Sequence, residues 1–143
     1  MKIITLAAFL FLAVLSVSCQ QKIRAESLYG DWNGESKCVG SNPYCHDEVV
    51  VYHISRSKKD AAMVNISADK IVNGKAEFMG EFDLTFDADK PSLTTEFTIP
   101  RTGGKGVWFF TIDGDNVEGT LTIYPEKEIT RKIRVTRKKS DKQ

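Results

Sequence analysis

Histidine is scarce in this chain, and its scarcity limits the catalytic sites that the protein can build. The two histidines, His46 and His53, lie close together in the sequence. A Ser–His–Asp catalytic set needs a histidine beside an activated nucleophile, and many hydrolases display that nucleophile in a Gly-x-Ser-x-Gly turn. The chain contains no such motif. We therefore expect a protein that is not an enzyme and has no catalytic residues.

The chain also lacks an excess of charge of either sign, with 20 basic and 19 acidic residues. Nucleic-acid-binding domains carry a marked basic excess, so no binding to nucleic acid is expected. Basic residues do gather near the end of the chain. We interpret residues 139–143 as a solvent-exposed basic tail. The alternative is a patch for phosphate or anionic lipid.

Clusters of metal ligands are equally sparse. Residues 45–48 read Cys-His-Asp-Glu, with Cys38 and His53 nearby, and cysteine and histidine are good zinc ligands. Their spacing matches no zinc finger or ribbon. The aspartates at 83–89 and 113–115 are more typical of turns than of a calcium site. We expect no metal site and no cofactor.

No apolar run is long enough to cross a membrane comfortably, but a short one opens the chain. Lys2 precedes an apolar and small-residue run over residues 3–17. A basic head, an apolar middle and a small-residue exit are typical of an export signal, whereas a spanning helix needs about 20 residues. We predict a signal peptide, as a helix, over residues 1–18 and a location in the cell envelope.

The three cysteines, Cys19, Cys38 and Cys45, are an odd number, which needs an explanation in an exported protein. Residues 15–19 resemble a bacterial lipoprotein signal, in which the cysteine becomes the lipid-modified first residue of the mature chain. In that family leucine usually stands where this chain has Ser16. The resemblance implies lipid on Cys19 and attachment to a membrane. The alternative is ordinary cleavage near Ser18, which would leave a soluble periplasmic or secreted protein.

Lipid on Cys19 leaves Cys38 and Cys45 as a pair. The residues between them, 39–44, are rich in turn formers, and an oxidising compartment permits a bridge. Closing so short a loop removes roughly 2–3 kcal/mol of unfolded-state entropy on the loop-closure model. We predict a disulfide between these two cysteines.

Apolar and polar residues alternate with a period of two through most of the chain after residue 30. In residues 78–86 every second residue is apolar or glycine, beginning with Phe78 and including Phe82, and the residues between are mostly acidic or polar. Near the end, Ile129, Ile133 and Val135 share a face. Such strands put one face in a core and the other in water. Strands are predicted at 30–37, 47–55, 61–72, 76–87, 92–99, 106–112, 116–123 and 128–137.

Only residues 61–72 mix strand and helix signals, and a short helix is the alternative there. Eight sequential antiparallel strands can close into a barrel, which removes both sheet edges. We therefore predict an all-β protein with one eight-stranded antiparallel up-and-down barrel over residues 28–138. Residues 19–27 are interpreted as a tether between the membrane and this domain.

The first strand opens with Gly-x-Trp at Gly30 to Trp32. Residues 28–34 resemble the start of lipocalin-like barrels, the calycin group that also includes the avidins. In lipocalins this tryptophan closes one end of the barrel and packs against a basic residue of the last strand. The resemblance implies that Trp32 is this plug and that Arg131 is its partner, with Arg137 as the second choice. Residues 45–52 also resemble small exported bacterial proteins of lipocalin-like type.

A barrel of this size is either filled by its side chains or holds one small ligand. We expect non-catalytic binding of a small apolar or amphipathic molecule, with a solid interior as the alternative. One of Tyr52 and His53 points inward, and alternation does not decide which. The residues predicted to line a cavity are Tyr52, His53, Phe82, Phe86, Phe97, Trp108 and Phe109.

Two other functions are open. Small exported barrels with one disulfide and a Gly-x-Trp strand resemble bacterial periplasmic protease inhibitors, whose N-terminal segment inserts into the enzyme. Residues 20–27 would then be the inserting arm of a protein-binding module. A purely structural envelope protein is the third interpretation.

Overall fold

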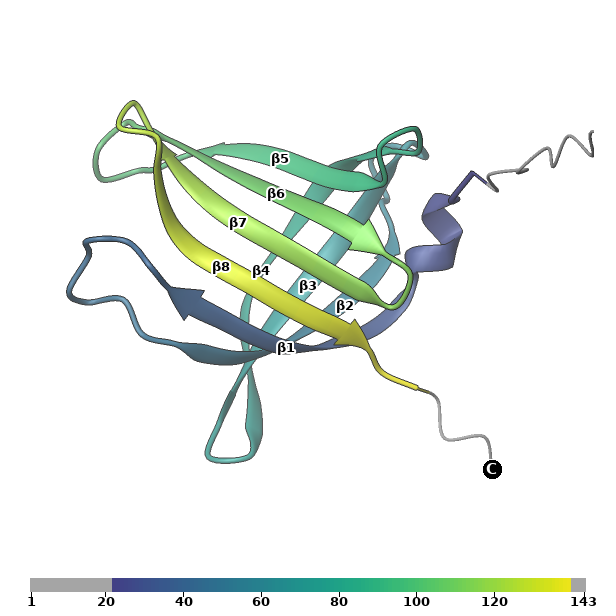
Figure 1. The fold of residues 1–143 in the computed structure, drawn as a ribbon, viewed down its shortest axis with the longest axis horizontal. Helices are drawn as coiled ribbons and strands as arrows, with labels where there is room; N and C mark the ends of the chain where they lie inside the picture. The colour runs from purple at the N-terminus through teal and green to yellow at the C-terminus, as the bar shows by residue number, and fades with distance from the viewer. Residues whose placement is uncertain (1–21, 140–143) are drawn as a thin grey trace, which may run out of the picture.

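The computed structural model describes residues 22–139. The predicted signal peptide over residues 1–18, the lipidation site Cys19 and most of the basic tail lie outside the described residues. Within them, eight antiparallel strands form a closed barrel in which sequence neighbours pair and the last strand pairs with the first (Figure 1). The predicted fold class, an all-β up-and-down barrel, is confirmed.

The elements follow one another in simple order. They are a single 3-10 turn η1 (Ala25–Leu28) and the strands β1 (Gly30–Cys38), β2 (Glu48–Arg56), β3 (Met63–Val72), β4 (Lys75–Asp87), β5 (Ser92–Thr98), β6 (Lys105–Asp113), β7 (Asn116–Tyr124) and β8 (Glu128–Arg137). The helix considered for residues 61–72 is absent, because most of that segment is β3. No helix in the described residues is long and apolar enough to cross a membrane.

Two short turns set the register of their hairpins. Asn73 and Gly74 join β3 to β4 with φ of 50° and 76°, and a two-residue hairpin loop with positive φ at both positions matches the twist of the strands. Gly114, with φ of 58°, opens the turn between β6 and β7. These are conformations that glycine and asparagine adopt more readily than other residues.

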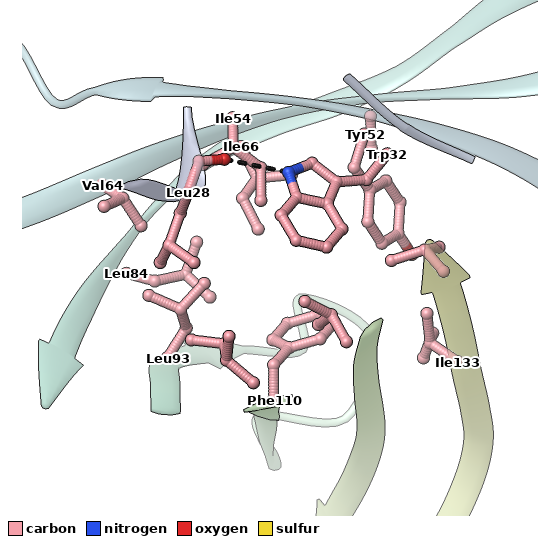
Figure 2. Close-up of a cluster of buried hydrophobic side chains, with 14 of the residues drawn as sticks. Leu28, Trp32, Tyr52, Ile54, Val64, Ile66, Leu84, Leu93, Phe110 and Ile133 are labelled. Carbon is pink, nitrogen blue, oxygen red and sulfur yellow. Dashed lines mark hydrogen bonds between the residues drawn. The ribbon is translucent and has the colours of Figure 1, made fainter. Parts of the chain in front are cut away.

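The core fills the end of the barrel beside η1, which we call the sealed end. Leu28 of η1 and Trp32 of β1 are 1% and 0% exposed. The Trp32 Nε1 donates a hydrogen bond of 2.9 Å to the Leu28 carbonyl, drawn as the dashed line in Figure 2. Side chains from the surrounding strands complete the cluster, which extends toward the middle of the barrel: Val50, Tyr52, Ile54, Val64, Ile66, Ala68, Leu84, Leu93, Phe110, Ile112, Val117, Ile133 and Val135. The plug predicted at Trp32 is present.

Arg137, and not Arg131, covers this tryptophan. The guanidinium carbon of Arg137 lies 4.3 Å from the centre of the Trp32 ring, and the same side chain donates hydrogen bonds to two carbonyls beside η1 and to Asp115. The β1–β8 register pairs Trp32 with Arg137, while Arg131 pairs with Cys38 at the other end of the barrel. The first-choice partner was wrong because both arginines share the inward face, and only the register decides which one reaches the indole.

A β-bulge turns Ile129 outward. Leu121 pairs with Arg131, but the next residue of β7, Thr122, pairs with Ile129, so β8 contains one extra residue at this point. An extra residue on one strand reverses the faces beyond it. Ile129 is consequently 42% exposed, whereas Ile133 is buried. The prediction that the two share a face is wrong.

A second bulge does the same to Phe78. Ala68 pairs with Gly80 and Asp69 pairs with Phe78, so β4 contains the extra residue here. Phe82, beyond the bulge, keeps its inward side chain, but Phe78 lies on the outer face and is 67% exposed. Strict alternation had assigned both phenylalanines to one face.

The β4–β5 pair is short. It contains only Thr85 with Thr94, Phe86 with Leu93 and Asp87 with Ser92, whereas β4 pairs with β3 along most of its length. Toward the β3–β4 turn, the two strands of the short pair diverge. The β3–β4 hairpin therefore continues on its own and projects from the barrel at the bottom of Figure 1.

Candidate functional site

The end of the barrel opposite η1, which we call the open end, has no plug comparable to Trp32 in the described residues. Its loops are the β1–β2, β3–β4, β5–β6 and β7–β8 connections. Strand register places one set of half-buried side chains on the inner face near these loops. They are Glu48, Lys70, Phe82, Trp108, Leu121, Ile123 and Arg131. We take this open half of the interior as the candidate site.

A row of aromatic rings connects the sealed core to the open half. Phe82 and Trp108 stack with their ring centres 6.3 Å apart and their planes 5° apart. Trp108 in turn stacks on Phe110 at 5.8 Å, and Phe110 meets Tyr52 edge-on at 6.3 Å. Such geometries are favourable for aromatic pairs. Phe110 and Tyr52 are buried, while Phe82 and Trp108 keep solvent contact, so the row presents an apolar surface on its open side.

A charged pair lies in the same half of the interior. One Nη of Arg131 donates hydrogen bonds to the Ser36 hydroxyl at 3.0 Å and to a Glu48 carboxylate oxygen at 3.2 Å. The two charged side chains are 20% and 23% exposed. A half-buried arginine needs such partners, because desolvating an unpaired charge is costly.

Tyr52 adds a neutral polar group to this cluster. Burial raises the pKa of its hydroxyl well above the usual range; the positive charge of Arg131 opposes that rise and the negative charge of Glu48 adds to it. The hydroxyl therefore stays protonated at any physiological pH and remains available as a hydrogen-bond donor.

A second ion pair stands at the rim. The Lys70 ammonium lies 3.5 Å from a Glu77 carboxylate oxygen, where β3 and β4 leave the barrel. Arg131 and Glu48 balance each other, as do Lys70 and Glu77, so these four inward groups carry no net charge. This half of the interior consequently combines aromatic surface with balanced polar groups.

The β1–β2 loop is fixed beside the open end. The predicted disulfide between Cys38 and Cys45 is present, and the backbone N–H groups of Val39 and Gly40 donate to the Thr130 carbonyl of β8. The Ser41 N–H donates to a Glu128 carboxylate oxygen at 2.6 Å, and this hydrogen bond lowers the pKa of Glu128. The loop is therefore fixed both by its own disulfide and by hydrogen bonds to β8.

The predicted lining residues divide into four groups. Tyr52, Phe82 and Trp108 point inward and form part of one aromatic row. Phe86 also points inward, but it packs against the core at the sealed end. Phe97 pairs with Gly106, two positions from the inward Trp108, so it also lies on the inner face, at the open rim. It is 40% exposed and covers Gly106, where an added Cβ would lie 2.3 Å from its ring.

The remaining two lie on the outer wall. Phe109 is 45% exposed and, with Val39, lines a shallow outer groove of about 570 Å³ across β1, β8, β7 and β6. Its neighbour Phe110, absent from the predicted set, is the ring that faces inward. Residues 107–112 are apolar on both faces, so alternation alone could not separate these two phenylalanines. Glu48 shares a face with Val50 and Tyr52, so it could be assigned to the interior only once the structure showed that this face points inward.

His53 is the outward member of the undecided Tyr52–His53 pair. Its Nδ1 lies 2.7 Å from an Asp31 carboxylate oxygen and its Nε2 lies 3.2 Å from an Asp69 oxygen. The hydrogen bond with Asp31 raises the pKa of His53, burial opposes this rise, and Asp69 reinforces it. The imidazole thus links β1, β2 and β3 on the outer wall. Within residues 22–139, no three Cys, His, Asp or Glu side chains are arranged to hold a metal ion.

Compared with known proteins, the chain matches no family model and no curated protein sequence. The closed eight-stranded antiparallel barrel is nonetheless consistent with the lipocalin-like fold that residues 28–34 imply. Function is therefore inferred from the geometry of the barrel itself.

Proposed function

We propose that this protein is a non-catalytic binding barrel whose open half takes a small amphipathic molecule. The observation that supports this function is the difference in solvent contact between the two halves of the barrel interior. The Phe82–Trp108 stack and the Arg131–Glu48 pair keep solvent contact, while the side chains around Trp32 are sealed. Covering aromatic surface would stabilise a complex, with roughly 2.5 kcal/mol for each 100 Å² removed from water.

The polar groups indicate the kind of head group. Arg131 and Glu48 already satisfy each other, so a ligand with a full net charge would have to separate this pair. A neutral or zwitterionic head can instead add hydrogen bonds to it without leaving a charge unpaired. We therefore propose an apolar body on the Phe82–Trp108 stack and a neutral or zwitterionic head near Arg131.

We further propose that the chain is an exported bacterial envelope protein, anchored to a membrane through lipid on Cys19. The support is the pattern of residues 1–19 and the Cys38–Cys45 disulfide, which is typical of oxidising compartments. Lys22 lies at the sealed end, 2.8 Å from Asp89 of the β4–β5 turn. An anchor only a few residues earlier would therefore hold the sealed end nearest the membrane.

The binding function is tested with the probe N-phenyl-1-naphthylamine, whose fluorescence rises in apolar surroundings. Wild type should bind it saturably, and Trp108→Leu should weaken binding at least tenfold. Phe109→Leu is the matched control, because it shortens the next aromatic residue of β6 on the outer wall, and it should leave affinity unchanged. Near-ultraviolet circular dichroism checks that both variants fold.

Two results would count against the proposal. If wild type does not bind the probe, the alternatives become a protein-binding module or a structural envelope protein. If both variants weaken binding equally, the probe lies outside the barrel. Lipid on Cys19 has its own test, since labelled palmitate should be incorporated into wild type and not into Cys19→Ser.

A further inference from the structure

We infer that the free edge of β4 is a docking site for an extended basic segment of a partner protein, which would add to the sheet as a strand. This inference is independent of ligand binding in the open half of the interior. Among residues 22–139, no strand pairs with the side of β4 that faces away from β3 over residues 75–84. We call this stretch the β4 edge.

An unpaired strand edge presents backbone N–H and C=O groups that another chain can satisfy. Proteins commonly recognise extended peptides in this way, with the main chain giving affinity and alternate side chains giving specificity. The β4 edge leaves the barrel with the projecting β3–β4 hairpin in Figure 1, so no other strand lies over its outer part. Its backbone is therefore accessible where the hairpin projects.

Apolar side chains accompany this edge. Phe78 is 67% exposed and lies on the outer face of β4, and Met79, the extra residue of the bulge, is also exposed. The bulge divides the edge into two short stretches, which restricts indiscriminate pairing. Exposed aromatic and thioether side chains beside free backbone groups are suited to anchoring one bound strand.

The charges of β4 indicate the character of the partner. Glu81 and Asp83 follow Phe78 on the same outer face. Asp83 is paired with Lys59 at 3.1 Å, whereas Glu81 has no ion pair among the described residues. An added strand would place every second side chain over this face, so lysine or arginine opposite Glu81 and an apolar residue opposite Phe78 would complement it.

The same charges disfavour a second copy of this chain. Two β4 edges that pair antiparallel about residues 81–83 would bring the acidic side chains of one copy against those of the other, and like charges directly opposite destabilise a strand pair. A basic segment from a different protein is therefore the occupant that the edge favours.

The test uses two fluorescein-labelled ten-residue peptides, one repeating Lys-Thr-Val-Thr and one repeating Glu-Thr-Val-Thr, so that charged and apolar side chains follow one another on the same face of the added strand. Fluorescence anisotropy should show binding of the lysine peptide alone. Glu81→Lys should weaken that binding at least tenfold. Glu126→Lys, which makes the same charge change in the exposed β7–β8 turn, should weaken it less than threefold. Hydrogen exchange should slow at backbone amides of residues 75–84 when the lysine peptide is bound.

Several results would overturn the inference. Equal weakening by both variants would indicate general charge attraction, and slowed exchange elsewhere would place the peptide on another surface. No slowing within residues 75–84 with either peptide, or a dimer in sedimentation that Glu81→Lys dissociates, would also contradict it. Naphthylamine binding should be unchanged in Glu81→Lys, which separates this test from that of the proposed function.

Discussion

The two ends of this barrel are built from the same strands and reach opposite outcomes. At the sealed end, Leu28 and Trp32 lie over the strand ends, and their side chains are almost completely buried. At the open end, Trp108 and Arg131 face the same interior and keep solvent contact. The alternation of apolar and polar residues gives every strand an inward face. Whether the side chains of that face are buried from solvent depends on a residue that lies across the ends of the strands.

The arginine side chains of the two ends also differ in what they contact. Arg137 at the sealed end stacks on an indole and satisfies backbone carbonyls, so its role is structural. Arg131 at the open end pairs with Glu48 inside the barrel, where a bound molecule could also reach it. Variants at the two ends should therefore separate stability from binding.

The largest effect on stability is expected for Trp32→Ala. Removing a fully buried indole leaves a cavity at the sealed end and should lower the free energy of unfolding by about 3–5 kcal/mol. Trp108→Ala should lower it by roughly half as much, because its indole is only half-buried. Urea unfolding followed by far-ultraviolet circular dichroism measures both. Equal losses would remove the distinction between the two ends.

The next largest effect is expected for the disulfide. Replacing Cys38 and Cys45 by serine frees the β1–β2 loop and should lower the free energy of unfolding by about 2–3 kcal/mol through the entropy of the unfolded chain. Because hydrogen bonds to Thr130 and Glu128 still hold the loop, the folded barrel should keep its naphthylamine affinity within a factor of three. Loss of binding in the folded double variant would show that the bridge shapes the open end.

A smaller effect is expected for Arg137→Ala. The variant loses the contact over the Trp32 ring and the hydrogen bonds to the segment beside η1, and it should lower the free energy of unfolding by about 1–2 kcal/mol. Arg137→Lys should restore only part of the loss, since an ammonium cannot reproduce the planar fork. Naphthylamine binding should not change, and a change in affinity would link the sealed end to the site.

The smallest effect is the pH dependence due to His53. Asp31 and Asp69 raise the pKa of His53 in the folded state. The charged imidazole therefore stabilises the fold below its unfolded pKa, near 6.5, and this stabilisation is lost as pH rises through the folded pKa. The melting temperature of wild type should exceed that of His53→Gln at pH 6, and the gap should narrow by pH 8.5. A gap that is constant with pH would contradict this assignment.

Much of the architecture could be predicted because the signals are local. Period-two alternation and the Asn73–Gly74 and Gly114 turns are read from adjacent residues, and they predicted the eight strands in nearly their observed bounds. The disulfide was predicted because lipid on Cys19 leaves Cys38 and Cys45 as a pair on either side of turn-forming residues. Trp32 was identified as the plug through resemblance alone.

What could not be predicted depends on relations between strands. The choice between Arg131 and Arg137 needed the β1–β8 register. Two bulges reversed the faces of Phe78 and Ile129. Gly80 stands beside the first bulge and is a signal that could have indicated it, whereas no glycine or proline stands beside the second within β8. The polar part of the site was missed for the same reason, since Ser36 and Glu48 meet Arg131 only when β1, β2 and β8 are placed side by side.

The most direct measurement compares the two tryptophans with one quencher. Trp32→Phe and Trp108→Phe each leave a single indole, at the open and the sealed end respectively. Titration with a bromine-labelled monoacyl phosphocholine, below its micelle concentration, should quench Trp108 saturably and leave Trp32 almost unchanged. Equal quenching of both indoles, or quenching of neither, would contradict the claim that one half of this interior is core and the other half binds an amphipathic molecule.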